Sequence, residues 1–167
     1  MGYQRRTVDD ELDQLLPGLA AIALEGAKGV GKTATAEQRA ATVLRLDDAA
    51  DRTAVAADPR TVLAHPRPVL VDEWQLVPEV WDVVRRQVDR DATPGQLLLT
   101  GSATASPGAR LHSGAGRIVR LRLRPMTLEE RGVATPSVHL SGLLTGARAP
   151  VHGSTNLTLA DYVETIV

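Results

Sequence analysis

The octapeptide GAKGVGKT at residues 26–33 constrains the fold of this chain more than any other feature. It fits the pattern G-x-x-x-x-G-K-[ST], and it lies between an apolar run at 19–26 and an alanine-rich helical segment at 32–41. A glycine-rich loop between a buried strand and a helix turns several backbone N–H groups towards one point, where they bind phosphate oxygens. The sequence therefore predicts a P-loop, a phosphate-binding loop that follows a buried strand.

The loop contains the only two lysines of a chain that otherwise uses arginine for positive charge. Lys32 stands at the motif position whose ammonium group reaches the β- and γ-phosphates, and Thr33 stands where a hydroxyl ligates Mg²⁺. Lys28 occupies a variable position, so a solvated loop lysine is the preferred interpretation for it. The predicted nucleotide-binding residues are Gly26, Ala27, Lys28, Gly29, Val30, Gly31, Lys32, Thr33 and Ala34.

A second motif, PVLVDEW at residues 68–74, is an aliphatic strand that ends in two acidic residues. This is the pattern of a Walker B element, in which Asp72 holds Mg²⁺ directly or through water. The adjacent Glu73 is then expected to orient and deprotonate the attacking water. The simpler alternative is a strand that merely ends in acidic residues at its solvent edge, and the P-loop upstream favours the Walker B interpretation.

A third aliphatic stretch, LLLTGSAT at residues 97–104, also ends in small polar residues. Thr100 or Ser102 is expected to face the γ-phosphate from the strand beside Walker B and to position the attacking water, the role called sensor 1. Ser and Thr are also common turn residues, so an ordinary turn is the alternative interpretation.

Apolar runs alternate with helical patterns along the chain, which favours an α/β fold with a mainly parallel sheet. The expected strands are 19–26, 42–48, 67–73, 95–104 and 117–124, and the expected helices are 9–16, 32–41, 48–58 and 77–91. Trp74 and Trp81 are expected to pack in the core rather than to contact a ligand.

The composition and charge of the chain exclude several classes of function. There is no cysteine, so disulfides, thiol nucleophiles and Cys-ligated zinc are ruled out. No apolar run is long enough to span a membrane and no signal-peptide pattern is present, so the expected location is the cytoplasm. The net charge of −1 gives no global attraction to nucleic acid. Arg120, Arg122 and Arg124 share one strand face, but no aromatic residue lies between them to stack on bases, so nucleic-acid binding is not expected.

The segments EGAKGVGKT, LVDEWQLVPEVWDVVRR, LLLTGSAT and HSGAGRIVRLRLRPMTLEE, in this order and spacing, resemble a group of bacterial and archaeal AAA-domain ATPases. The resemblance covers residues 1–131 and implies a P-loop NTPase three-layer sandwich, with a five-stranded parallel sheet in the order 5-1-4-3-2. It also implies an arginine finger before the fifth strand, at Arg117 or Arg110, that reaches a nucleotide bound in a neighbouring subunit. Members of this group usually carry a C-terminal domain of unassigned role, so residues 132–167 are expected to be a linker and the start of a truncated C-terminal region.

The leading functional hypothesis is Mg²⁺-dependent ATP binding and hydrolysis by an AAA-type ATPase that acts as a switch or remodelling module. Its expected partners are ATP, further copies of the same chain and a protein client that the sequence does not identify. The absence of an N-K-x-D guanine-reading pattern favours ATP over GTP. A small-molecule P-loop kinase is one alternative, and a nucleotide-binding interaction module without significant turnover is another.

Overall fold

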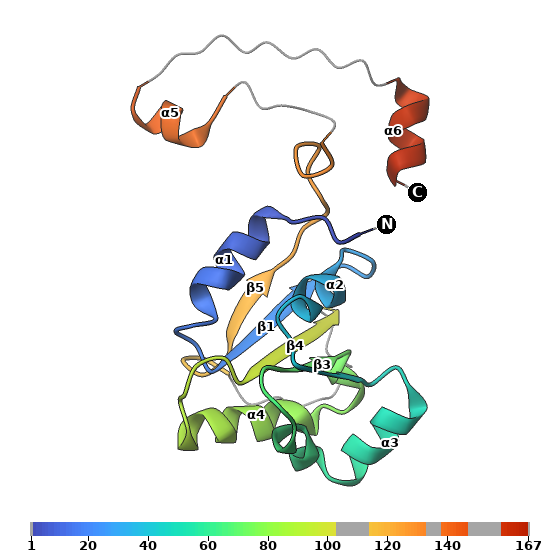
Figure 1. Cartoon of the computed structure of the whole chain (residues 1–167), viewed down its shortest axis with the longest axis vertical. Coiled ribbons are helices and arrows are strands. Elements are labelled where there is room, and N and C mark those ends of the chain that lie inside the picture. Colours follow the sequence, from blue (N-terminus) through green and yellow to red (C-terminus); the bar gives the residue numbers. More distant parts are fainter. Residues whose placement is uncertain (1, 103–113, 133–137, 147–157, 167) are drawn as a thin grey trace. The chain divides into compact units, whose positions relative to one another are not determined.

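The computed structural model describes residues 2–102, 114–132, 138–146 and 158–166, and its strands form one five-stranded parallel sheet (Figure 1). The strands are β1 (Ala21–Gly26), β2 (Thr42–Arg45), β3 (Val69–Asp72), β4 (Leu97–Ser102) and β5 (Val119–Arg122). They lie side by side in the order β2-β3-β4-β1-β5, and every pairing is parallel. The α/β fold and the strand order expected from the sequence are therefore confirmed.

Helices connect β1 to β2, β2 to β3 and β3 to β4, the usual form of crossover between parallel strands. The α-helices are α1 (Thr7–Leu15), α2 (Lys32–Glu37), α3 (Ala49–Ala57), α4 (Glu79–Arg90), α5 (Leu140–Leu144) and α6 (Leu159–Ile166). Two 3₁₀-helices, η1 (Pro59–Ala64) and η2 (Trp74–Leu76), flank β3. The first helix begins at Thr7, two residues before the start that the acidic residues suggested.

The helix after the P-loop is shorter than its alanine-rich sequence predicts. The pattern indicates a helix over 32–41, whereas α2 ends at Glu37. The backbone N–H groups of Ala41 and Thr42 donate to the carbonyl of Pro68, at 2.8 and 3.3 Å, and so begin the pairing of β2 with β3. Helix propensity is a weak preference, and here the sheet hydrogen bonds determine where the helix ends.

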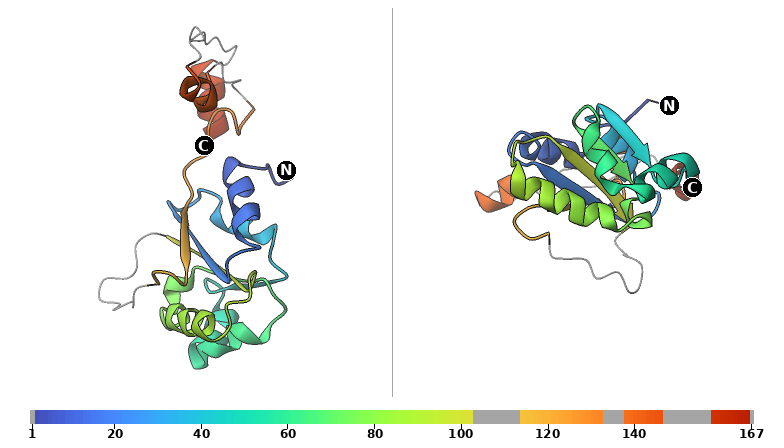
Figure 2. Two further views of the ribbon diagram at one scale, coloured as in Figure 1. Left: turned by 90° about the vertical axis from the view of Figure 1, so that its left-hand side faces the viewer. Right: turned by 90° about the horizontal axis from the view of Figure 1, so that it is seen from below.

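Two apolar layers cover the two faces of the sheet, because successive strand residues point to opposite faces. On one face, α3, η1 and α4 pack against alternate strand residues in a cluster that includes Val55, Val62, Val80, Trp81, Val84, Ala23, Val71 and Leu99. On the other face, α1 and α2 pack in a cluster that includes Leu12, Ala36, Ile22, Leu24, Leu70, Leu98 and Leu121. Figure 2 shows α1 and α4 on opposite sides of the strands, which is the expected three-layer arrangement.

Both tryptophans pack in the core, as expected from the sequence. Trp81 is fully buried and Trp74 is 5% exposed, and their ring centroids lie 4.8 Å apart. The guanidinium of Arg120 lies 4.8 Å from the Trp81 ring centroid, and Arg120 Nη1 is 3.3 Å from Glu25 Oε1. On the edge strand β5, Arg120 therefore covers an aromatic ring and pairs with a carboxylate, whereas Leu121 is buried on the opposite face.

The described residues form two units, Met1–Pro125 and Met126–Val167. The first contains the sheet, α1 to α4 and both 3₁₀-helices; the second contains α5 and α6. Within the described ranges, no helix combines the length and the apolar character needed to cross a bilayer.

Replacing Trp81 tests this core. The Trp81→Ala variant should lower the free energy of unfolding by about 3–5 kcal/mol, because a fully buried aromatic side chain is removed beside Trp74. Trp81→Phe is the matched comparison: it retains a ring and should lose less. Chemical unfolding followed by circular dichroism measures both values. An Ala variant within about 0.5 kcal/mol of the parent protein, the range of ordinary surface substitutions, would contradict this packing.

Candidate functional site

The P-loop connects β1 to α2 with the geometry that phosphate binding requires. Gly26 is the last residue of β1, and a Cβ there would lie 2.5 Å from the Leu123 carbonyl oxygen, so only glycine fits. Gly31 has φ +95° and immediately precedes α2, a left-handed conformation that disfavours residues with a Cβ. The two glycines therefore allow the chain to turn sharply from the strand into the helix.

Lys32 lies inside the loop. Its side chain is buried, and Nζ donates to the carbonyl oxygens of Gly26 and Ala27, at 3.1 and 2.8 Å. Lys28 is exposed, as a solvated loop lysine would be. Of the other predicted loop residues, Ala27, Gly29 and Ala34 are exposed, and Val30, Gly31 and Thr33 are partly buried. The ammonium group of Lys32 is thus held among the loop carbonyls, where it can be redirected to a phosphate.

Asp72, the last residue of β3, connects this strand to the P-loop helix α2 and to β4. Its Oδ1 accepts a hydrogen bond of 2.8 Å from Thr33 Oγ1 and a second one from Thr100 Oγ1. Thr100 is fully buried and stands opposite Asp72 in the pairing of β3 with β4. The structure therefore brings Thr33, Asp72 and Thr100 together, and the buried hydroxyl of Thr100 orients the carboxylate.

The pair formed by Thr33 and Asp72 fits a Mg²⁺ ion. A hydroxyl and a carboxylate are hard oxygen donors of the kind that Mg²⁺ prefers. Two neighbouring ligands of an octahedral Mg²⁺, each about 2.0–2.1 Å from the ion, lie about 2.9 Å apart. The 2.8 Å between Thr33 Oγ1 and Asp72 Oδ1 is close to that separation.

Glu73 has an unusual backbone conformation. Its φ of 52° and ψ of 43° are left-handed, and among the residues with described geometry it is the single non-glycine with positive φ. Such conformations cost energy and concentrate at functional sites. The side-chain amide of Gln75 donates a hydrogen bond to Glu73 Oε2, and Gln75 Oε1 lies too close to Gly101 for a Cβ to fit there without a shift. The contact of Gln75 with Glu73 was not expected from the sequence. The signal that could have indicated it is an amide side chain two residues after Glu73.

The proposed arginine finger does not join this site within one chain. Arg117 lies just before the amino end of β5, whereas the P-loop follows the carboxyl end of the neighbouring parallel strand β1. Arg117 Nε instead lies 2.5 Å from Asp89 Oδ1 at the end of α4. The alternative finger, Arg110, lies outside the described residues. Ser102 pairs with Gly26 at the carboxyl edge of the sheet, beside the loop.

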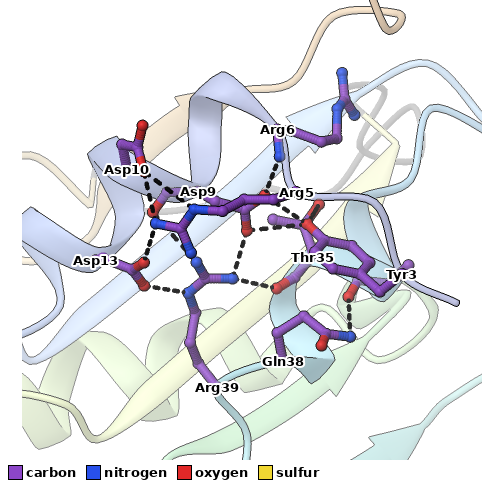
Figure 3. Close-up of polar contacts among 10 residues, drawn as sticks. Tyr3, Arg5, Arg6, Asp9, Asp10, Asp13, Thr35, Gln38 and Arg39 are labelled. Atoms are coloured by element: carbon purple, nitrogen blue, oxygen red, sulfur yellow. Dashed lines mark hydrogen bonds and ion pairs between the residues drawn. The ribbon is translucent and has the colours of Figure 1, made fainter. Parts of the chain in front are cut away.

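A buried ionic network holds α1 against α2, the helix that follows the P-loop (Figure 3). Arg39 Nη1 donates to Asp9 Oδ1 at 2.6 Å and to the carbonyl of Thr35 at 3.0 Å. The hydroxyl of Tyr3 lies within hydrogen-bond distance of both Asp9 oxygens, and the backbone N–H of Arg6 donates to Asp9 Oδ2 at 2.6 Å. Asp9 is fully buried, so Tyr3, Arg6 and Arg39 replace the water that its carboxylate loses on folding.

The network changes the acidity of Asp9. Burial alone raises the pKa of this carboxyl, but the hydrogen bonds from Tyr3, Arg6 and Arg39 outweigh burial and hold the pKa below its ordinary value of 3.8. Because the folded-state pKa is lowered, ionised Asp9 stabilises the fold above the ordinary pKa. This contribution is lost as the pH falls through the lowered value.

The fold and the loop define a nucleotide-binding protein of the P-loop NTPase class. A family model described as an AAA domain matches residues 20–132, more than half of the chain. The chain therefore belongs to this family of AAA domains. No curated protein gives a significant match. Among solved structures, a mutant of RuvB from Thermotoga maritima is similar at 21% identity and a TM-score of 0.41. The match covers 73% of this chain and 44% of that one, so the chain spans less than half of the RuvB structure.

Replacing the Asp9 carboxylate tests the network through its pH dependence. Asp9→Asn should lower the free energy of unfolding by about 1.5–3 kcal/mol at pH 7, because hydrogen bonds to an ionised group are lost. The difference from the parent protein should narrow below about pH 4, since the native carboxyl is then progressively protonated. Asp10→Asn, one residue along on an exposed face, is the control and should change stability little. A difference that stayed constant from pH 7 to pH 3 would show that ionisation of Asp9 contributes nothing.

Proposed function

We propose that this AAA domain binds ATP together with Mg²⁺ and hydrolyses it, in the cytoplasm, as a switch or remodelling module. The observation that carries the proposal is the convergence on Asp72, which accepts hydrogen bonds from Thr33 and Thr100 with Glu73 next in the chain. A metal-binding pair beside a second carboxylate is the arrangement that nucleotide hydrolysis needs.

Each residue of the site has a distinct role in this proposal. The loop N–H groups and Lys32 bind the phosphates, while Thr33 and Asp72 hold Mg²⁺, which when bound neutralises charge on the phosphate oxygens. Glu73 acts as the general base that accepts a proton from the attacking water. The hydrogen bond from Gln75 fixes one oxygen of that base, and Thr100 keeps Asp72 oriented towards Thr33.

Two substitutions separate nucleotide binding from hydrolysis. Lys32→Ala should abolish ATP binding, because the buried ammonium is lost from the loop. Glu73→Gln should bind ATP normally but release phosphate at least about 10²-fold more slowly, the lower end of the contribution of a general base. Titration calorimetry measures binding, and a phosphate-release assay measures turnover.

The loop offers its own control, since Lys28→Ala removes the other lysine, which is exposed, and should leave both measurements close to those of the parent protein. Hydrolysis by Glu73→Gln at the parent rate would show that Glu73 is not the base. Transfer of phosphate to a metabolite rather than to water would favour a small-molecule kinase.

We also propose that full activity requires a second copy of the chain. Arg117 lies near the amino ends of the strands, whereas the P-loop of the same chain lies at their carboxyl ends. Arg117 can therefore act only on a nucleotide held by a neighbouring chain. An arginine supplied in this way contributes about 10³–10⁵ in rate in other phosphoryl-transfer systems.

Phosphate release measured against protein concentration tests this requirement. The rate per chain should rise with concentration in the parent protein and stay low in Arg117→Ala. Arg90→Ala, an exposed arginine at the end of α4, is the matched control. A rate per chain that does not depend on concentration would rule out an arginine acting in trans, and a negligible rate throughout would favour a nucleotide-binding interaction module.

A further inference from the structure

Arg6 is a buried arginine at the back of the P-loop. Arg6 is the residue immediately before α1, and it is 7% exposed. Nη1 donates to the carbonyl of Val30 at 2.7 Å, and Nη2 donates to the carbonyl of Arg124 at 2.7 Å. Burying a guanidinium is costly unless its N–H groups are hydrogen-bonded, so these two carbonyls are integral to its placement.

The hydrogen bond to Val30 bears directly on phosphate binding. The peptide that joins Val30 to Gly31 is planar, and in a trans peptide the N–H points away from the carbonyl. When Arg6 holds the Val30 carbonyl on one side of the loop, the N–H of Gly31 faces the other side. Arg6 Nη1 also lies 3.5 Å from the position that a Cβ on Gly31 would occupy, so it directly backs the turn.

The position of Arg6 is itself fixed by the network around Asp9. Its backbone N–H donates to Asp9 Oδ2, and its guanidinium points away from that network in Figure 3. Asp9 is bound in turn by Arg39, which also contacts the carbonyl of Thr35 in α2. These contacts therefore fix the N-terminal segment relative to α2. The Arg6 guanidinium extends from that segment to the P-loop, which precedes α2.

The second carbonyl gives Arg6 a connection beyond the loop. Arg124 follows β5 and is the last residue before Pro125, where the first unit ends. One guanidinium thus spans the phosphate-binding loop and the segment through which the chain leaves the nucleotide-binding unit. The planar fork of the guanidinium assigns a separate nitrogen to each carbonyl, whereas an ammonium would have to make both hydrogen bonds from one atom.

We propose that Arg6 is a positioning residue of the P-loop, which orients the Val30–Gly31 peptide for phosphate and ties the loop to the segment after β5. The inference rests on the nucleotide-binding part of the proposed function and is independent of hydrolysis. It assigns a role in the nucleotide site to the N-terminal segment, which precedes the stretch at 20–132 matched by the family model.

Affinity for MgATP, measured by titration calorimetry well below the unfolding temperature, tests the proposal. Arg6→Ala and Arg6→Lys should each weaken binding by about tenfold or more, the equivalent of one hydrogen bond to a charged group, while the variants remain folded. Arg5→Ala is the control, because Arg5 is adjacent in sequence but exposed, with ion pairs only to Asp10 and Asp13 among those described. Its affinity should match that of the parent protein.

The outcomes are distinguishable. If the parent protein binds MgATP and folded Arg6→Lys binds it equally well, the role of Arg6 is wrong while the proposed function stands. If neither Arg6 variant folds, Arg6 is a folding residue and the positioning role is wrong. If Arg6→Ala alone fails to fold, Arg6→Lys decides. If the parent protein does not bind MgATP, the proposed function and this inference both fall.

Discussion

The candidate nucleotide site depends on one carboxylate oxygen, Asp72 Oδ1, which accepts hydrogen bonds from Thr33 and Thr100. These three residues belong to three elements that are remote in sequence: β3, α2 and β4. Parallel pairing in the order β2-β3-β4-β1-β5 brings the carboxyl ends of these strands to one edge, where the P-loop also lies. The central strands are apolar and buried on both faces, so their polar ends are the places where chemistry can be exposed to a ligand.

The P-loop is supported from two sides. On one side Asp72 contacts the first turn of α2 through Thr33, and on the other Arg6 contacts the Val30 carbonyl. The buried pair of Asp9 and Arg39 connects the second support to α2. Buried ion pairs often add little net stability because desolvation opposes their attraction. Their value here is geometric, since they restrict how α1, Arg6 and the P-loop helix can move relative to one another.

Much of the site was predictable because its motifs are local. The P-loop follows an apolar strand, Asp72 and Thr100 lie towards the carboxyl ends of two others, and parallel strands align such ends. Gln75 and Arg6 were not predictable in the same way. An arginine near the N-terminus reads as a solvated surface residue, and only the packing of α1 across the sheet places Arg6 against Val30. Likewise, a glutamate in the sequence gives no indication that its backbone adopts the left-handed conformation seen at Glu73.

The sequence by itself determined the class of fold, which follows from apolar periodicity, and the glycine-rich loop, which follows from glycines at fixed spacing. The strand order came only from the resemblance of its motifs to AAA-domain ATPases. Tertiary structure alone decided that α2 ends at Glu37, that Arg117 pairs with Asp89, and that Arg6 backs the loop. The physical reason is the same in each case: these features depend on hydrogen bonds and ion pairs between residues distant in sequence, whose partners no local pattern specifies.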